Sequence, residues 1–301
     1  MTRCPVCLSC KSVVVRSYRA TLPGSTAVFG GLQMRRCQSC GGCFADPLLS
    51  ENVLKEYYAD DYRAVGTSHR LEQDPGAWDG SHVRARAQYE FVMRQASRGD
   101  GVPPVRSWLD VGAGYGFLLD EAKKRGVPET AAVEPDWHGR GRLAKSGHHV
   151  FGGLEEVGGQ WDVISFSHLL EHLPRPQAFL RQIRSLLSET GLVFCEVPND
   201  TDVEGATNDA PHLVFFTPAC LTSLFDTVRF EVLEVQTCGR LWRDRWTAEL
   251  RALTRRVGMR LLASPPPWLD RLVHHHFRYS RDGRQWIRLL ATSHTHGGGG
   301  K

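Results

Sequence analysis

Two pairs of cysteines near the start of the chain have the spacing of metal ligands. Cys4 and Cys7 form one C-x2-C pair, and Cys37 and Cys40 form a second pair after 29 intervening residues. A C-x2-C turn points two sulfur atoms at one point, so two such turns supply the four thiolates of a tetrahedral zinc site. The spacing therefore predicts a zinc ribbon, with each pair at the tip of a short hairpin.

The other five of the nine cysteines divide into two groups. Cys10 and Cys43 lie close to the pairs but do not share their spacing, so the paired cysteines are the predicted ligands and the role of these two stays open. Cys195, Cys220 and Cys238 stand in apolar surroundings and are expected to be core thiols. An all-thiolate shell leaves no open coordination position, which favours a structural metal over a catalytic one.

A glycine-rich loop, residues 109–117, lies between a predicted strand and a predicted helix. Gly112, Gly114 and Gly116 allow a tight turn and a close approach of a ligand to the backbone at the helix N-terminus. Their G-x-G-x-G spacing differs from the G-x-G-x-x-G of dinucleotide enzymes. The spacing favours a ligand without a pyrophosphate group, although the triplet alone also suits a plain tight turn.

Acidic residues on either side of this loop favour a ligand site over a plain turn. Asp110 precedes the glycines, and Glu134 follows Gly114 by 20 residues, at the end of the second predicted strand. A carboxylate in that place can accept hydrogen bonds from both ribose hydroxyls of a nucleoside.

Three histidines are candidates for moving a proton. His168 follows the fourth predicted strand, at the sheet edge where ligands bind in open α/β folds. His172 would share a face with it, beside Glu171, if residues 167–173 were helical. A structural pair packed against the sheet explains these two equally well. His212 is the favoured candidate of the three, because it follows a loop, residues 199–211, that we expect to cover the pocket.

The elements that must position these residues form an alternating pattern from residue 105 onward. Short apolar runs predict strands over 107–111, 130–134, 161–166, 191–197 and 230–235, and helical patterns lie between them over 117–125, 139–145, 177–187 and 218–226. This alternation predicts an α/β fold with a parallel sheet covered on both faces. The sequence has no run of about 18 apolar residues, which excludes a transmembrane helix of ordinary length.

The 301 residues divide into four predicted segments: a zinc ribbon over 1–48, with strands near 12–15 and 27–29, a helical connector over 49–104, a ligand-binding core over 105–240, and a helical extension over 241–301. The net charge of +4 combines a C-terminal quarter, from Gly239 onward, of +9 with a remainder of −5. Such a basic segment attracts phosphates. Because its aromatic residues follow no regular order, a solvated helical face is the favoured interpretation.

In these motifs the sequence resembles the class I methyltransferases that use S-adenosylmethionine (SAM). The resemblance rests on residues 109–116, on Glu134, on residues 162–176 and on the fifth strand, residues 191–198. It implies a Rossmann-like doubly wound sheet. The cysteine pairs and residues 40–47 are similar to the zinc-ribbon prefix of bacterial methyltransferases of sugar, glycan and natural-product pathways.

The resemblance also implies two cofactors, SAM and Zn²⁺, and a set of site residues. The SAM-binding residues that it implies are Asp110, Gly112, Ala113, Gly114, Gly116, Glu134, Gly153, Leu154 and Ser167. In the sugar C-methyltransferases of this group, a His-Glu-His segment and a downstream tyrosine carry the proton chemistry. Only His212 matches here, since Pro211 stands at the glutamate position and Phe215 at the tyrosine position. The resemblance therefore favours methylation of oxygen or nitrogen over carbon, with His212, His168 and His172 as the candidate catalytic residues.

Three functions remain open at this point. We expect a cytoplasmic methyltransferase of a small molecule, sugar or glycan, since the N-terminus lacks a signal peptide and the thiols suit a reducing compartment. An RNA methyltransferase that grips nucleic acid with the basic segment is the first alternative. Against it, the Asn/Asp-Pro-Pro-aromatic motif of enzymes that methylate base amines is absent after the fourth strand. A non-catalytic protein or a nicotinamide oxidoreductase is the second. The sequence gives no indication of oligomeric state.

Overall fold

The computed structural model describes residues 2–21, 24–59, 75–96, 104–201, 203, 206, 208–240, 279–280 and 285–293. Its strands are β1 (Ser12–Ser17), β2 (Gln33–Cys37), β3 (Cys43–Asp46), β4 (Ser107–Val111), β5 (Glu129–Val133), β6 (His149–Phe151), β7 (Trp161–Ser167), β8 (Leu187–Pro198), β9 (Val214–Phe215), β10 (Glu231–Arg240), β11 (Tyr279–Ser280) and β12 (Trp286–Thr292). Its helices are α1 (Ser25–Phe29), α2 (Glu51–Ala59), α5 (Pro75–Ala96), α6 (Phe117–Lys124), α7 (Trp137–Lys145), α8 (Pro176–Leu186) and α9 (Pro218–Thr227), with 3₁₀ turns η1 (Leu154–Glu156) and η2 (Leu170–His172).

The main sheet has the strand order β11-β10-β12-β8-β7-β4-β5-β6. Strands β6, β5, β4, β7 and β8 are parallel, and β12 is antiparallel to both β8 and β10. The chain adds β5 and β6 on one side of β4 and then returns to add β7 and β8 on the other. The strand order therefore reverses between β4 and β7, the place where open α/β sheets bind ligands.

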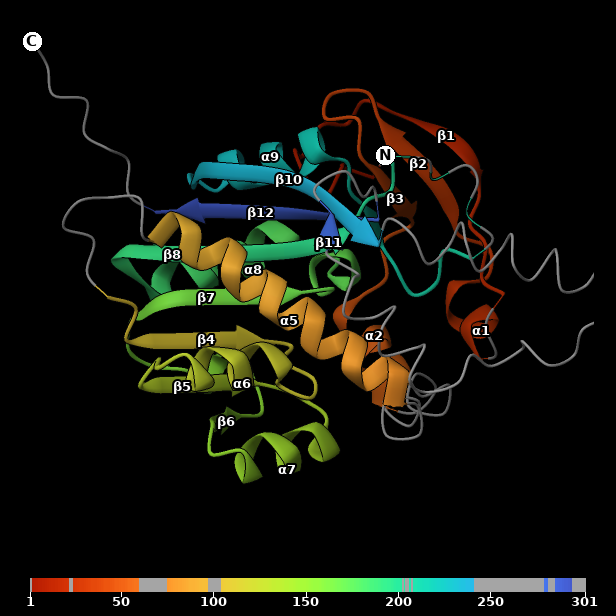
Figure 1. Ribbon diagram of the computed structural model, residues 1–301. Helices are drawn as coiled ribbons and strands as arrows, with labels where there is room; N and C mark the ends of the chain where they lie inside the picture. Colours follow the sequence, from red (N-terminus) through yellow and green to blue (C-terminus); the bar gives the residue numbers. More distant parts are fainter. Residues whose placement is uncertain are drawn as a thin grey trace, which may run out of the picture.

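Helices cover both faces of this sheet (Figure 1). On one face, buried side chains of α5, α6 and α7 pack with Trp108 and Val163. On the other face, side chains of α8 and α9 pack with Leu109 and Ile164. Neighbouring residues of one strand thus serve opposite cores, as a sheet buried on both faces requires. The predicted doubly wound α/β fold is confirmed.

A second, smaller sheet lies beside the main one in Figure 1 and has the order β1-β2-β3-β9. Its first three strands come from the N-terminal segment. The fourth, β9, comes from the core segment, between β8 and α9 in the chain. Its buried side chains, including Phe29 and Met34, belong to the same hydrophobic cluster as α8 and α9. The prediction of a strand near 27–29 is wrong, because these residues form α1. Phe29 is buried there between the rings of Tyr18 and Tyr57, at centroid distances of 5.9 Å and 5.0 Å.

The C-terminal segment also differs from expectation where it is described. Residues 286–292 form β12 in the middle of the main sheet, between β8 and β10, rather than part of a helical extension. The side chains of Ile287, Leu289, Leu290 and Ala291 on this strand are fully buried, so it belongs to the core. Residues 241–278, which include most of the basic segment, lie outside the described residues. Among the described helices, none combines the length and the apolar character needed to cross a membrane.

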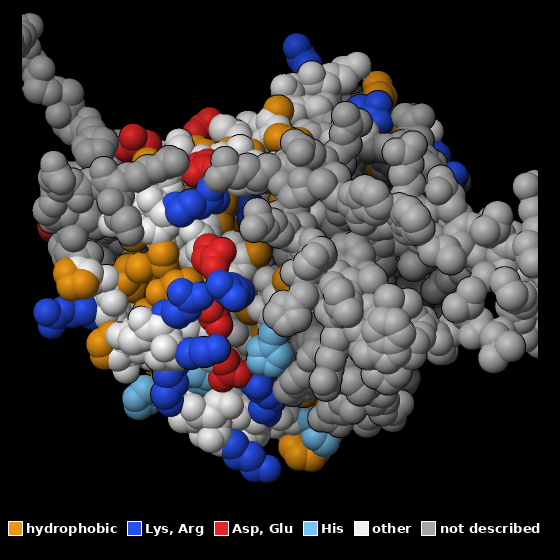
Figure 2. Space-filling model, in the orientation of Figure 1, with side chains coloured by type: hydrophobic (Ala, Val, Ile, Leu, Met, Phe, Trp, Pro, Cys, Tyr) orange, Lys and Arg blue, Asp and Glu red, His pale blue; other side chains and the backbone are white. Residues whose placement is uncertain are grey.

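Acidic and basic side chains alternate along the middle of the face shown in Figure 2. Arg86 and Arg125 form ion pairs with Glu90, and Arg125 also pairs with Glu121. The described part of this face is therefore of mixed charge and does not present a continuous basic stripe of the kind that tracks a nucleic-acid backbone.

Candidate active site and metal centre

A cavity of about 430 Å³ opens at the carboxyl ends of β4, β5 and β7, where the strand order reverses. Its lining includes six residues that the sequence predicted as ligand-binding: Asp110, Gly112, Ala113, Gly114, Glu134 and Ser167. His168 lines it as well. Gly116, Gly153 and Leu154, which were predicted with them, are not among its lining residues.

The glycines of the loop have different roles. Gly112 and Gly114 have φ of 74° and 54°, the left-handed region that glycine adopts without strain. A Cβ atom added to Gly114 would meet no heavy atom of the described residues within 4 Å, so the backbone there is open to the cavity. A Cβ atom on Gly116 would lie 2.4 Å from Cδ2 of Leu143. Gly116 therefore allows α6 and α7 to pack closely.

Two carboxyl groups face the cavity from neighbouring strands. Glu134 accepts hydrogen bonds from the backbone N–H groups of Gly114 at 2.7 Å and of Asp136 at 2.9 Å. A carboxylate has about four lone-pair positions, so Glu134 can accept further hydrogen bonds from a ligand. Burial raises the pKa of Glu134, and it raises the pKa of Asp110 to about 7 even though Ser165 donates a hydrogen bond to Asp110.

Helix α5 contributes a polar wall that the sequence analysis missed. Arg84 and Gln88, one helical turn apart, line the cavity, and both donate hydrogen bonds to the buried carboxylate of Glu196. Arg288 of β12 donates another at 2.6 Å. Burial alone would raise the pKa of Glu196, but the two arginines lower it to about 2. Gln88 also bonds to Ser167 at 3.1 Å, which ties α5 to the end of β7.

His168 lies where the cavity meets a cluster of buried polar side chains. Its φ of 54° is unusual for a residue other than glycine, and its N–H donates to the carbonyl of Glu196 at 2.8 Å. Such backbone strain is commonest at functional sites. Its Nδ1 lies 3.2 Å from Oε1 of Glu171. The helix expected over 167–173 is a single 3₁₀ turn, so His168 and His172 are not stacked on one helical face.

Glu171, His172 and His212 lie together behind His168. The two imidazole rings are 5.0 Å apart between centroids, and Nδ1 of His172 lies 2.9 Å from the hydroxyl of Tyr58. Burial lowers the pKa of His172 and lowers that of His212 to about 4. Burial would raise the pKa of Glu171, but the hydrogen bond to His168 and the nearby imidazoles lower it. At neutral pH the cluster therefore pairs one carboxylate with neutral imidazoles.

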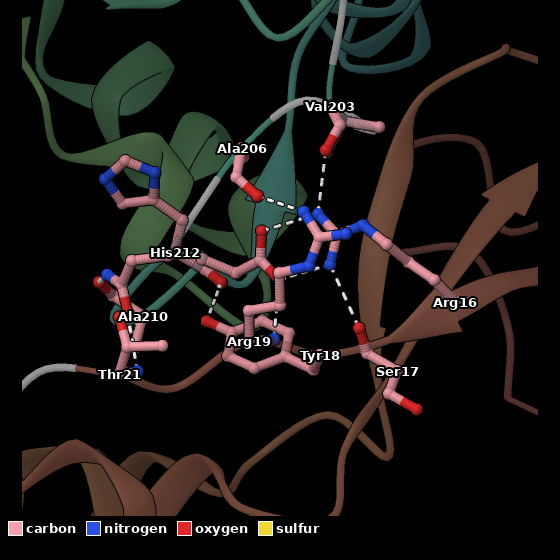
Figure 3. Close-up of polar contacts among 11 residues, drawn as sticks. Arg16, Ser17, Tyr18, Arg19, Thr21, Val203, Ala206, Ala210 and His212 are labelled. Carbon is pink, nitrogen blue, oxygen red and sulfur yellow. Dashed lines mark hydrogen bonds and ion pairs between the residues drawn. The ribbon is translucent and has the colours of Figure 1, made fainter.

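The N-terminal unit, which is the segment that carries β1, β2 and β3, contacts the loop that carries His212 (Figure 3). Tyr18 donates to the carbonyl of His212 at 2.6 Å, and Arg16 forms a bidentate ion pair with Asp209 at 2.5 Å and 2.7 Å. Arg19 donates to the carbonyl of Ala206. The loop then continues into β9, which pairs with β3. The N-terminal sheet is thus part of the framework that places His212.

The four paired cysteines converge, as predicted. Their sulfur atoms all lie within 4.8 Å of one another, with Cys4 and Cys40 at 3.7 Å and Cys7 and Cys37 at 3.5 Å. Four thiolates about 2.3 Å from a zinc ion are about 3.8 Å apart, so the spacing suits such an ion. Against the effect of burial, backbone N–H groups of Cys40 and Ser39 lower the pKa of Cys37 to about 7, whereas hydrogen bonds between thiols and burial raise the pKa of Cys4, Cys7 and Cys40. The spacing of the four sulfur atoms lets the group hold a metal, an arrangement compatible with a zinc ribbon.

The structure shows where the five cysteines outside the group of four lie. Cys10 is exposed and Cys43 is buried, and neither belongs to the group of four. Cys195 and Cys238 are buried, as expected. Cys220 is also buried, but its sulfur lies 4.0 Å from that of Cys40. The start of α9 therefore packs directly against the cysteine centre.

The comparisons with known proteins agree with this geometry. A family model described as "Methyltransferase domain" matches residues 80–236. No curated protein matches the sequence.

The plantazolicin methyltransferase BamL, solved with a triazolic desmethylPZN analog and SAH, is 12% identical, with a TM-score of 0.53 over 80% of this chain and 94% of that one. The plantazolicin methyltransferase BpumL, solved with SAH, is 11% identical, with a TM-score of 0.51 over the same shares. At these identities the likeness shows the fold alone. A SAM-dependent methyltransferase from Archaeoglobus fulgidus is 17% identical, with a TM-score of 0.44 over 69% of this chain and 94% of that one.

Proposed function

The chain belongs to the methyltransferase domain family, whose model covers more than half of it, and from that premise we propose that it transfers a methyl group from SAM to an oxygen or nitrogen atom of a small molecule, sugar or glycan intermediate. The observation that carries the proposal is the cavity at the reversal of strand order, which joins the glycine loop, Glu134 and His168.

The residues of the cavity fit the donor. The open backbone at Gly114 leaves room for a ligand against the loop, and the free lone pairs of Glu134 suit the two ribose hydroxyls. Asp110 offers a carboxyl group to the cationic methionine end of the donor. Arg84, from α5, offers a cation to its carboxylate.

Methyl transfer needs alignment of donor and acceptor and removal of one proton. Bound SAM supplies an electrophilic methyl group. His168 would take the proton of the acceptor, because it is the candidate histidine that lines the cavity and its Nδ1 is held by Glu171. His172 and His212, the other two candidates, lie one side chain further from the cavity, in the cluster around Glu171.

For the N-terminal unit we propose a structural zinc ion held by the four paired cysteines. Four thiolates satisfy the ion completely and leave no position for a substrate. We also propose a cytoplasmic location, which is supported by the nine cysteines being free thiols in the structure.

Calorimetry with SAM and with NADH tests the proposal directly. We expect SAM to bind at one site per chain. We expect NADH not to bind, because the G-x-G-x-G loop is shorter than the G-x-G-x-x-G loop that binds a pyrophosphate. Incubation with SAM labelled in its methyl group should then label a nucleotide-linked sugar or another small acceptor. Failure of SAM to bind would refute the proposal, and labelling of RNA alone would replace the acceptor class with nucleic acid.

Cofactor affinity should depend on pH through Asp110, whose pKa of about 7 lies close to neutrality. The ionised form attracts the cationic donor, so binding should strengthen as the pH rises from 6 to 8. At pH 6 about one-tenth of Asp110 is ionised, so the affinity should fall by up to about tenfold relative to pH 8. In Asp110→Asn this part of the dependence should vanish and leave a uniformly weaker affinity. Parallel pH profiles of the two proteins by calorimetry cancel the titration of SAM itself, and identical profiles would contradict the assignment.

A further inference from the structure

A second group of potential ligand atoms lies in the core, apart from the cysteines. The ligand atoms of Glu171, His172 and His212 all lie within 4.8 Å of one another. Glu171 is fully buried, and its Oε2 has no hydrogen-bond partner among the residues that the structure describes, although its Oε1 lies 3.2 Å from Nδ1 of His168. A buried carboxylate oxygen without a partner is costly, so its retention calls for an explanation.

The surroundings of the cluster fix the orientation of these side chains. The hydroxyl of Tyr58 lies 2.9 Å from Nδ1 of His172, and the other ring nitrogen, Nε2, lies 3.9 Å from Oε1 of Glu171. The N–H of Leu213 donates to the carbonyl of Glu171 at 2.6 Å, and Tyr18 holds the carbonyl of His212. Metal-binding histidines characteristically have one ring nitrogen held by such an outer partner.

We propose that Glu171, His172 and His212 bind a divalent first-row transition-metal ion. Two imidazole nitrogens and one carboxylate oxygen form a ligand set that such ions accept with coordination positions left open. Bonds of about 2.1 Å bring ligand atoms to about 3–4 Å from one another, so side-chain shifts of roughly an ångström would close the site. The orphaned Oε2 of Glu171 would become a ligand, which accounts for its missing partner.

The position of the site suggests what the ion does, and this part of the inference rests on the proposed methyl transfer. Glu171 connects the site to the cavity through its hydrogen bond to His168. Through Glu171 the ion would hold His168 in position to take the proton of a hydroxyl-bearing acceptor in the cavity. The hydroxyl proton then passes to His168, the oxygen forms a bond to the methyl carbon, and the carbon–sulfur bond of SAM breaks with its electron pair left on sulfur.

Cobalt binding to the full-length protein tests the site. Co²⁺ is titrated into protein whose cysteine centre is filled with one zinc ion per chain, as checked by elemental analysis, and binding is followed by visible absorption and calorimetry. We expect one saturable Co²⁺ per chain, with a spectrum free of thiolate-to-cobalt charge transfer. Glu171→Gln, which preserves shape, and His212→Ala should each weaken that binding at least about tenfold, because each removes one of three ligands.

His149→Ala is the matched control, because His149 is an exposed histidine at the start of the edge strand β6, outside the group of Glu171, His172 and His212, and it should leave cobalt binding unchanged. The run His274–His276 lies outside the described residues and is the same in every protein compared, so any cobalt that it binds cancels. Equal cobalt binding by the parent and both variants would overturn the site, as would a thiolate spectrum with release of zinc. SAM calorimetry on the same samples confirms that the variants are folded. It also separates the two proposals. A parent protein that binds SAM but not cobalt refutes only the metal site, and one that binds cobalt but not SAM refutes only SAM as the methyl donor.

Discussion

Replacing Gly114 by arginine should abolish SAM binding while the protein stays folded. A Cβ atom at this position meets no heavy atom of the described residues within 4 Å, so the arginine side chain would extend from the loop into the cavity. It would occupy the space of the methionine end of the donor. We expect the affinity to fall at least about 100-fold, equivalent to about 2.7 kcal/mol, when measured by calorimetry.

Gly126→Arg provides the matched control for this variant. Gly126 also has a positive φ, 94°, and a Cβ atom there also meets nothing within 4 Å, but the residue is exposed at the end of α6. Each variant places a side chain in the left-handed region, at a cost of about 1–2 kcal/mol. Similar losses of melting temperature with SAM affinity lost only in Gly114→Arg would locate the effect in the cavity. Undiminished binding by Gly114→Arg would remove the glycine loop from the donor site.

The parts of the fold that the sequence predicted depend on local signals. Alternating apolar runs predicted β4, β5, β7, β8 and β10 and the helices between them, but not the short strands β6 and β9, and the spacing of the cysteines predicted the group of four. The glycine loop and Glu134 could be paired because both follow neighbouring parallel strands. In each case the evidence lies within a few residues or follows from the order of the strands.

The missed parts depend on contacts between distant residues. Strand β12 joins the sheet by pairing Arg288 with Glu196, 92 residues earlier, and nothing local distinguishes its short apolar run from a packed helix turn. In the sequence, Arg84 and Gln88 resemble ordinary polar residues of an amphipathic helix. Only the contact between α5 and the end of β7 shows that they line the cavity. Cys220 was assigned to the core correctly, but its approach to Cys40 requires the N-terminal sheet to dock on α9.

The histidines show the same division within the site. The sequence identified His168, His172 and His212 as candidates, and the structure brings all three around Glu171. What the sequence could not supply was their unequal access to the cavity, which follows from the left-handed backbone of His168 and the 3₁₀ turn behind it. It also could not show that the N-terminal unit contacts the loop of His212, since 194 residues separate Tyr18 from that histidine.

Cys37→Ser should destabilise the protein and lower methyl transfer without removing the donor site. Loss of one thiolate weakens the metal centre, and the side chains around it are continuous with the core on the α8 and α9 face. We expect the free energy of unfolding to fall by about 4 kcal/mol or more, as losses of structural metals do, and the melting temperature to fall by roughly 10 °C. Bound zinc, measured by elemental analysis, should fall with it.

The second consequence separates this variant from a merely unstable protein. The described cavity lining comes from α5, α6, α7 and the loops after β4, β5 and β7, so SAM affinity below the melting temperature should change by less than about threefold. Tyr18 and Arg16 of the N-terminal unit hold the loop of His212. Because His212 is a ligand of the proposed metal site that positions His168, the rate of methyl transfer should fall much further. Cys10→Ser is the control, because Cys10 is exposed and outside the group of four, and it should change none of these quantities. If Cys37→Ser kept its zinc and its melting temperature, the cysteine centre would not be a metal site. If the variant lost zinc and melting temperature but retained full methyl transfer, the N-terminal unit would not position His212.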